Sequence, residues 1–102
     1  MLNKVLKDIV SDKKPVVLYF YSKKYLNTLD SLKTLEELQE KHEDVIIIHK
    51  INIDDNKKII KDFAILSIPL IICYKNKKEV YRFTGSQTRR QIETIIYMTI
   101  NN

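Results

Sequence analysis

The stretch Val16-Val17-Leu18-Tyr19-Phe20-Tyr21, followed by the corner Ser22-Lys23-Lys24-Tyr25-Leu26-Asn27-Thr28, decides the fold of this chain. The first six residues are all apolar or aromatic, which predicts a buried strand. Leucines then recur at every third position, at Leu29, Leu32, Leu35 and Leu38, which predicts a helix. A corner between a strand and a helix lies at the helix N-terminus, where backbone N–H groups lack an intrahelical partner. The corner is therefore the first place to look for a functional site, yet it holds no thiol, histidine, carboxylate or glycine.

Length and composition predict one domain over residues 1–102. The chain has 102 residues, of which 44% are hydrophobic, with one glycine and two prolines. This is enough apolar material for one core but too short a chain for two. No repeat or flexible linker interrupts it.

The cysteine and histidine content excludes several kinds of site. Cys73 is the only cysteine, so the chain can form no internal disulfide and no zinc site built from thiolates. His42 and His49 are too few for a metal cluster, and we expect no cofactor. Cys73 lies in the apolar run before Tyr74, so we expect a buried core residue; the alternative is the reactive thiol of a single-thiol redox protein.

The net charge of +5 comes from lysine pairs spread along the chain, at Lys13-Lys14, Lys23-Lys24, Lys57-Lys58 and Lys77-Lys78. Such pairs in loops usually keep a protein soluble, so we do not expect a nucleic-acid partner; the alternative is a nucleic-acid or anionic-surface binder.

The longest uncharged run, from Ala64 to Tyr74, is too short to span a bilayer. We expect a cytoplasmic protein with no membrane partner.

Periodicity and capping signals predict eight elements in the order α, β, α, β, α, β, β, α. The helices are expected at about Leu2–Ser11, at Asn27–His42 with Asn27 or Thr28 as N-cap, after Asp54-Asp55-Asn56 with an inner face of Ile59, Ile60 and Phe63, and from Thr88 with an inner face of Ile92, Ile95, Ile96 and Thr99. The strands are expected at Val16–Tyr21, Val45–Ile53, Leu70–Tyr74 and Glu79–Thr84. Together they predict an α/β domain, a four-stranded mixed sheet flanked by helices on both faces.

Several motifs, in this order and spacing, resemble the thioredoxin family. They are Lys14-Pro15-Val16-Val17-Leu18-Tyr19-Phe20-Tyr21, Lys50-Ile51-Asn52-Ile53-Asp54, Ser67-Ile68-Pro69, Tyr74-Lys75-Asn76 and Gly85. The resemblance implies a thioredoxin-like fold over most of the chain. It also aligns the two cysteines of the family's Cys-x-x-Cys site with Tyr25 and Thr28, so that the site reads Tyr25-Leu26-Asn27-Thr28, and the family's buried acid with Tyr19.

The resemblance therefore implies a thioredoxin-like protein that is not a dithiol oxidoreductase, because the exchange reaction needs both thiols. What it leaves is the groove, in which the family's cis proline presents main-chain groups to an extended protein segment. The implied partner is a protein or an extended peptide, and the implied groove residues are Tyr25, Leu26, Ile68, Pro69, Thr84 and Gly85. Two alternatives stay open: Pro69 serves only the turn before its strand, and Tyr25 and Leu26 only pack over the corner.

Overall fold

The computed structural model describes residues 13–102, so the helix expected at Leu2–Ser11 lies outside the described residues. The elements follow the order β1 (Val16–Tyr21), η1 (Leu26–Thr28), α2 (Leu32–His42), β2 (Ile47–Asn52), η2 (Ile53–Asp55), α3 (Lys58–Asp62), β3 (Leu70–Lys75), β4 (Lys78–Thr84) and α4 (Arg89–Ile100), where η1 and η2 are single 3₁₀ turns.

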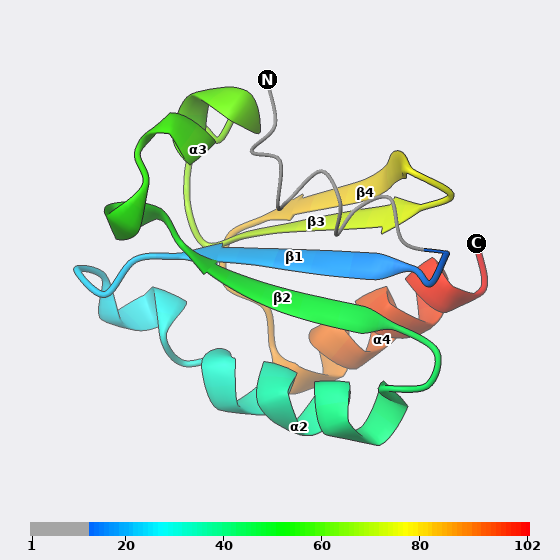
Figure 1. Cartoon of the computed structure of the whole chain (residues 1–102). Coiled ribbons are helices and arrows are strands. Elements are labelled where there is room, and N and C mark those ends of the chain that lie inside the picture. Colours follow the sequence, from blue (N-terminus) through cyan, green and yellow to red (C-terminus); the bar gives the residue numbers. More distant parts are fainter. Residues whose placement is uncertain (1–12) are drawn as a thin grey trace.

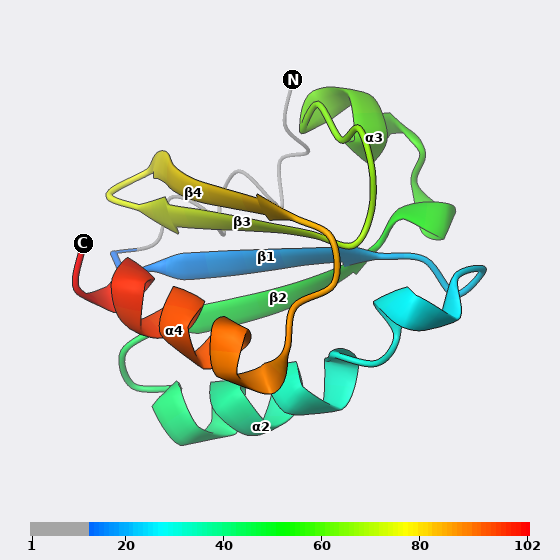
Figure 2. The ribbon, with the colours of Figure 1, turned by 180° about the vertical axis from the view of Figure 1, so that it is seen from behind.

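The four strands form one mixed sheet in the order β2-β1-β3-β4. β1 pairs in parallel with β2 and antiparallel with β3, and β4 continues the sheet as a hairpin with β3. α3 covers one face of this sheet, and α2 and α4 lie together on the other (Figures 1 and 2). The expected four-stranded mixed sheet with helices on both faces is confirmed.

Alternate residues of β1 supply two separate cores, because neighbouring side chains of a strand point to opposite faces. Val16, Leu18 and Phe20 face α3 and pack with Ile59 and Phe63 in one cluster. The second cluster, on the side of α2 and α4, takes the other β1 residues together with Leu35, Leu38, Ile71, Cys73, Ile92, Ile95 and Ile96. β1 is thus buried on both faces and carries the site at its C-terminal end.

The C-terminal helix follows its sequence signals closely. The side chain of Thr88 accepts a hydrogen bond from the N–H of Gln91, and the side chain of Gln91 accepts one from the N–H of Thr88, which makes the expected capping box. The expected inner face is also confirmed, since its four members are the buried residues of α4: Ile92, Ile95, Ile96 and Thr99.

The helix expected at Asn27–His42 was wrong at its start. α2 begins at Leu32, and neither Asn27 nor Thr28 is its N-cap; Ser31 occupies that position without a side-chain cap bond. Residues 26–28 instead form the 3₁₀ turn η1. The reason is a competing set of hydrogen bonds, because the Thr28 hydroxyl bonds back to the end of β1 and holds the chain in a tighter turn.

Two further boundaries differ from expectation. β2 is shorter than Val45–Ile53, because the N–H groups of Val45 and Ile46 both donate to the carbonyl of His42 and close the turn after α2. Ile60 was expected on the inner face of α3 but is exposed. A helix of five residues is too short to bury two adjacent isoleucines, so Ile59 enters the core and Ile60 does not.

Candidate functional site

The corner between β1 and α2 is closed from beneath by Thr28. Its Oγ1 lies 2.5 Å from the carbonyl oxygen of Ser22 and 2.7 Å from that of Tyr25, and its one proton is donated to one of them at a time. Oγ1 also accepts a 3.1 Å bond from the Ser22 N–H. Thr28 is fully buried, so its side chain belongs to the support of the corner and not to its surface.

Tyr19 braces the same turn from the sheet. Its ring is buried in the core on the side of α2 and α4, and its hydroxyl donates a 2.7 Å hydrogen bond to the Thr28 carbonyl. Burial raises the pKa of this phenol above its usual value, so it stays protonated at neutral pH. At the position where the resemblance expects an acid, the chain therefore holds a neutral hydrogen-bond donor.

A carboxylate ties the corner to the neighbouring strand. Ser22 Oγ donates to both carboxylate oxygens of Asp54, at 2.7 and 2.9 Å, and the N–H of Lys23 donates to Oδ2 at 3.0 Å. Sequence reasoning did not find this bond. A signal was available, because Ser22 directly follows β1, Asp54 follows β2 by two residues, and the ends of parallel neighbours meet at one edge of a sheet.

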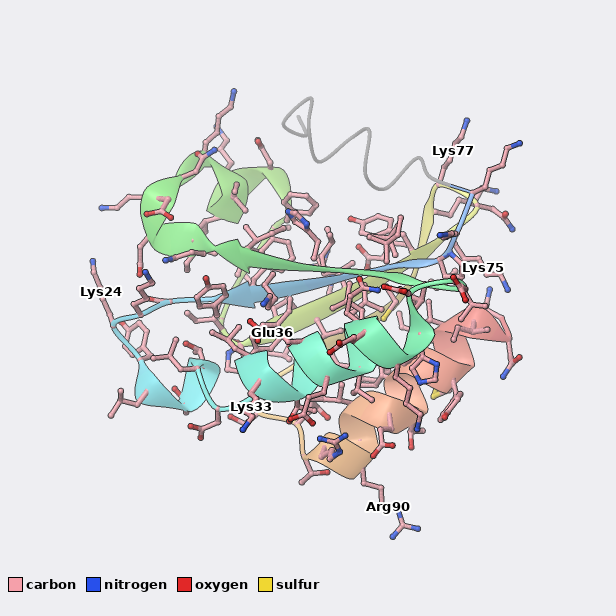
Figure 3. All side chains as sticks on the ribbon, turned by 60° about the horizontal axis from the view of Figure 1, so that its bottom comes forward. Lys24, Lys33, Glu36, Lys75, Lys77 and Arg90 are labelled. Atoms are coloured by element: carbon pink, nitrogen blue, oxygen red, sulfur yellow. The ribbon has the colours of Figure 1, made fainter. Side chains whose placement is uncertain are left out.

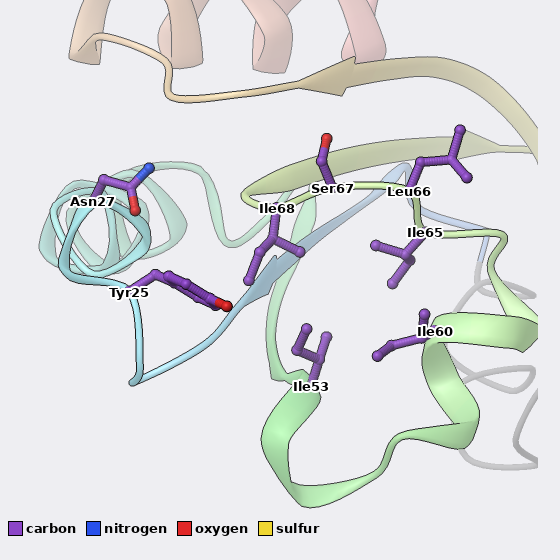
Figure 4. Close-up of a pocket in the computed structure, with 8 residues that line it drawn as sticks. All are labelled: Tyr25, Asn27, Ile53, Ile60, Ile65, Leu66, Ser67 and Ile68. Carbon is purple, nitrogen blue, oxygen red and sulfur yellow. The ribbon is translucent and has the colours of Figure 1, made fainter.

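A hollow of about 420 Å³, lined mainly by apolar side chains, opens beside the corner. Figure 4 shows its walls: Tyr25 comes from the corner, Ile53 and Ile60 from the η2–α3 segment, and Ile65 and Ile68 from the segment before β3. Asn27, Leu66 and Ser67 complete the lining. We call this hollow the groove. Tyr25 stands at its side without filling it, and the side chain is 58% exposed.

The structure brings only some of the expected groove residues to this hollow. Tyr25 and Ile68 line it. Leu26 is 78% exposed at the tip of the corner but does not line the groove, so neither apolar corner residue is packed away. Six lining residues had no expected role in the groove: Asn27, Ile53, Ile60, Ile65, Leu66 and Ser67. Leu66 is 98% exposed, and an apolar residue directly before Ser67-Ile68-Pro69 was a signal that could have been used.

The turn before β3 leaves main-chain groups available. The Ile68-Pro69 peptide bond is cis. Within residues 13–102, no hydrogen bond to the N–H or C=O of Ile68 is found. The Pro69 carbonyl is occupied, because it accepts a 2.9 Å bond from the N–H of Gly85. This bond places the Thr84-Gly85 loop beside Pro69, although neither of its residues lines the hollow.

Gly85 is conformationally required. Its φ of +95° lies in the region that L side chains rarely adopt, and the space where a Cβ would stand is open. The backbone, and not crowding, therefore selects glycine beside Pro69.

The family model for thioredoxin matches residues 2–98 of this chain. The chain belongs to the thioredoxin family. A thioredoxin from Alicyclobacillus acidocaldarius is 37% identical over 59 residues, so the match spans 58% of this chain and little more than half, 56%, of that relative. A thioredoxin from Buchnera aphidicola is 26% identical over 93 residues, 90% of this chain and 85% of that protein.

Solved structures support the fold. A mutant thioredoxin from Halobacterium salinarum NRC-1 superposes with a TM-score of 0.86 over 98% of this chain and 87% of that chain, at 19% sequence identity. At this identity the likeness concerns the thioredoxin fold alone.

This member of the thioredoxin family has one cysteine, and its side chain is buried. Cys73 lies in β3 and is fully buried, as expected. Burial raises the pKa of its thiol from 9.0 to about 11, so the thiol stays protonated at neutral and mildly alkaline pH.

In the part of the chain that the structure describes, no group of three or more histidine, cysteine or acidic side chains could hold a metal ion.

The lysine pairs do not converge on one face. Register places Lys13-Lys14 and Lys77-Lys78 at one end of the sheet, because Val16 pairs with Tyr74 and Lys75 with Lys78. Lys23-Lys24 and Lys57-Lys58 lie at the other end of the sheet, because they come after the C-terminal ends of β1 and β2. Figure 3 shows this separation, with Lys24 at one end of the molecule and Lys75 and Lys77 at the other.

None of the helices in residues 13–102 is long and apolar enough to cross a membrane.

We predict that Thr28→Val destabilises the protein by about 2 kcal/mol, because it leaves the buried N–H of Ser22 without a partner and removes the hydroxyl bond to the Ser22 carbonyl while conserving volume. Urea unfolding followed by circular dichroism measures this. Thr28→Ser is the matched control: it keeps the hydroxyl, loses one buried methyl, and should cost about 1 kcal/mol. Equal stability of Thr28→Val and the wild type would show that the hydroxyl does not hold the corner.

We predict that Cys73 does not react with dithiobisnitrobenzoate in the native protein at pH 8 within minutes. Because the pKa of its thiol is raised to about 11, almost all of the thiol is protonated at pH 8, and the sulfur is shielded from solvent. In concentrated guanidinium chloride one equivalent should react, which serves as the control. Stoichiometric labelling of the native protein within seconds would favour the single-thiol redox alternative.

Proposed function

We propose that this chain is a protein-binding or structural module of the thioredoxin family without dithiol–disulfide redox activity, and that it binds an extended segment of a partner protein in the groove beside Pro69. The observation that carries the proposal is the open apolar groove with unpaired main-chain groups at Ile68, next to a corner that has no thiol.

The absence of exchange chemistry follows from the reaction itself. A thiolate attacks a disulfide to form a mixed disulfide, and a second thiol of the same protein then resolves it. Cys73 is the only thiol of the chain, it is buried, and its raised pKa keeps it protonated. The alternative of a single-thiol enzyme is disfavoured for the same reasons.

Binding in the groove would use two kinds of contact. The N–H and C=O of Ile68 can pair with the main chain of an extended segment, as an added strand does at a sheet edge. The hollow can take apolar side chains of that segment against Ile53, Ile60 and Ile65. Exposure of Tyr25 and Leu66 at its rim supports this proposal, because grouped apolar side chains on a surface mark interaction sites.

We predict no reduction of insulin disulfides above the rate of dithiothreitol alone, because the chain cannot supply both an attacking and a resolving thiol. Turbidity of precipitating insulin chains measures the reaction, and Cys73→Ala should give the same background trace. Turnover that Cys73→Ala abolishes would contradict the proposal and identify Cys73 as the reacting group.

We predict that Leu66→Asp abolishes most peptide binding without changing stability. A phage library of random decapeptides is selected on the immobilised wild-type protein, and the affinities of enriched peptides are measured by fluorescence anisotropy. A carboxylate in the apolar rim should weaken binding about tenfold or more. Thermal unfolding should stay unchanged, because the Leu66 side chain is 98% exposed.

Val45→Asp is the matched control, since Val45 is also an exposed apolar residue but lies in the turn after α2, away from the groove. It should leave peptide affinity within about twofold of wild type. If enriched peptides bind Leu66→Asp as tightly as they bind the wild type, the binding site lies outside the groove. Failure to enrich any peptide would contradict the proposed function.

A further inference from the structure

Two of the segments that line the groove carry lysines that form no ion pair within the described part of the chain. Lys23 and Lys24 belong to the corner, and Lys57, Lys58 and Lys61 belong to the α3 segment; we call these five the groove lysines. All five are exposed, and none of them is in any ion pair or side-chain hydrogen bond found within residues 13–102.

The groove lysines stand next to lining residues. Lys24 directly precedes Tyr25 in the corner, and Figure 3 shows its side chain extending outward at that end of the molecule. On the other wall, Lys57 precedes Ile60 by three residues within the helical turn of α3, so the two side chains share one side of the helix. Lys61 directly follows Ile60.

The acidic side chains of the same segments are largely occupied. The carboxylate of Asp54 accepts hydrogen bonds from Ser22 and Lys23 within the corner. Asp62 is half-buried and engaged in an interaction of its own. Asp55 is exposed. These segments thus carry five lysines and three aspartates, and they leave a net positive charge around the hollow, because a carboxylate that accepts hydrogen bonds from neutral donors keeps its charge.

Five of the other acids of residues 13–102 lie on and after α2, across the sheet from α3: Glu36, Glu37, Glu40, Glu43 and Asp44. Asp30 precedes α2, Glu79 lies in β4 and Glu93 in α4. Several of them have cationic partners, since Glu36 pairs with Lys50 and Glu37 with Arg89. Ion pairs therefore link α2 to β2 and to α4, whereas the groove lysines take part in none that is found within residues 13–102.

We infer that the segment held in the groove is an acidic one, in which apolar residues are flanked by aspartate or glutamate. This inference rests on the proposed function and adds the chemistry of the partner. The apolar residues enter the hollow, and the flanking carboxylates lie within reach of the lysines on its two walls. Complementary charge at such a rim speeds association and selects among partners.

The test uses the random decapeptide library on the wild type and on Lys24→Glu/Lys57→Glu. Peptides enriched on the wild type should carry acidic residues beside apolar ones, and those enriched on the double variant should carry basic residues instead. A wild-type-selected acidic peptide should bind the double variant about tenfold more weakly at low salt, and Lys24→Gln/Lys57→Gln should show a smaller loss.

Lys77→Glu/Lys78→Glu is the matched control, because it makes the same charge change at the opposite end of the sheet and should leave affinity within about twofold. Circular dichroism verifies that every variant is folded. Enriched peptides without acidic bias, or equal losses in both double variants, overturn the inference while the proposed function stands. A twenty-nucleotide oligothymidylate serves as the competitor. If it displaces the peptides at a concentration below their own dissociation constant, the inference is overturned, since the occupant would then be a nucleic acid.

Peptide selection that fails on the wild type, or binding that Leu66→Asp does not affect, contradicts the proposed function itself and with it this inference. The two failures are therefore distinguishable, because the first concerns only the charge of the flanks and the second concerns the groove.

Discussion

The hydroxyl of Thr28 is the constraint on which the candidate site depends. Oγ1 meets the N–H and the carbonyl of Ser22, six residues earlier, and so bends the chain leaving β1 into a tight turn before α2 begins. The turn leaves Tyr25 and Leu26 on the outside and the hydroxyl inside. Tyr19 secures it from the sheet with a bond to the Thr28 carbonyl. A polar network of this kind stabilises a structure only when its members are satisfied, and no buried polar side-chain atom of residues 13–102 lacks a partner.

This network explains how the corner can keep its shape without thiol chemistry. Thiols are weak hydrogen-bond donors, whereas a threonine hydroxyl donates and accepts strongly. The Ser22–Asp54 bonds add a second link, since they connect the corner to the segment that supplies Ile53 and Ile60 to the groove. The two walls of the groove are thus joined by charge-assisted hydrogen bonds at the end of the sheet, where the parallel strands β1 and β2 terminate.

The same arrangement gives the surface its character. α3 is short and buries Ile59 and Phe63, so Ile60 is left to face the hollow. Leu66 and Ile68 approach from the segment before Pro69, whose cis bond and contact with Gly85 set the entry to β3. Lysines follow the strand ends on both sides of this hollow, while the acids of α2 lie on the opposite face of the sheet. An apolar hollow between unpaired cations is a surface on which a complementary segment gains both burial and charge pairing.

The sequence by itself determined the type and order of the four strands and of α2, α3 and α4, the burial of β1, the capping box and inner face of α4, and the lack of a thiol pair. These are local properties, because periodicity and capping depend on residues within a few positions of each other. Only the tertiary structure decided where α2 begins, that Ile60 and Leu66 border the groove, and that the lysine pairs divide between two ends of the sheet. The Thr28–Ser22 and Ser22–Asp54 bonds compete with local preferences, and they exist only once the fold brings β1, β2 and the corner together.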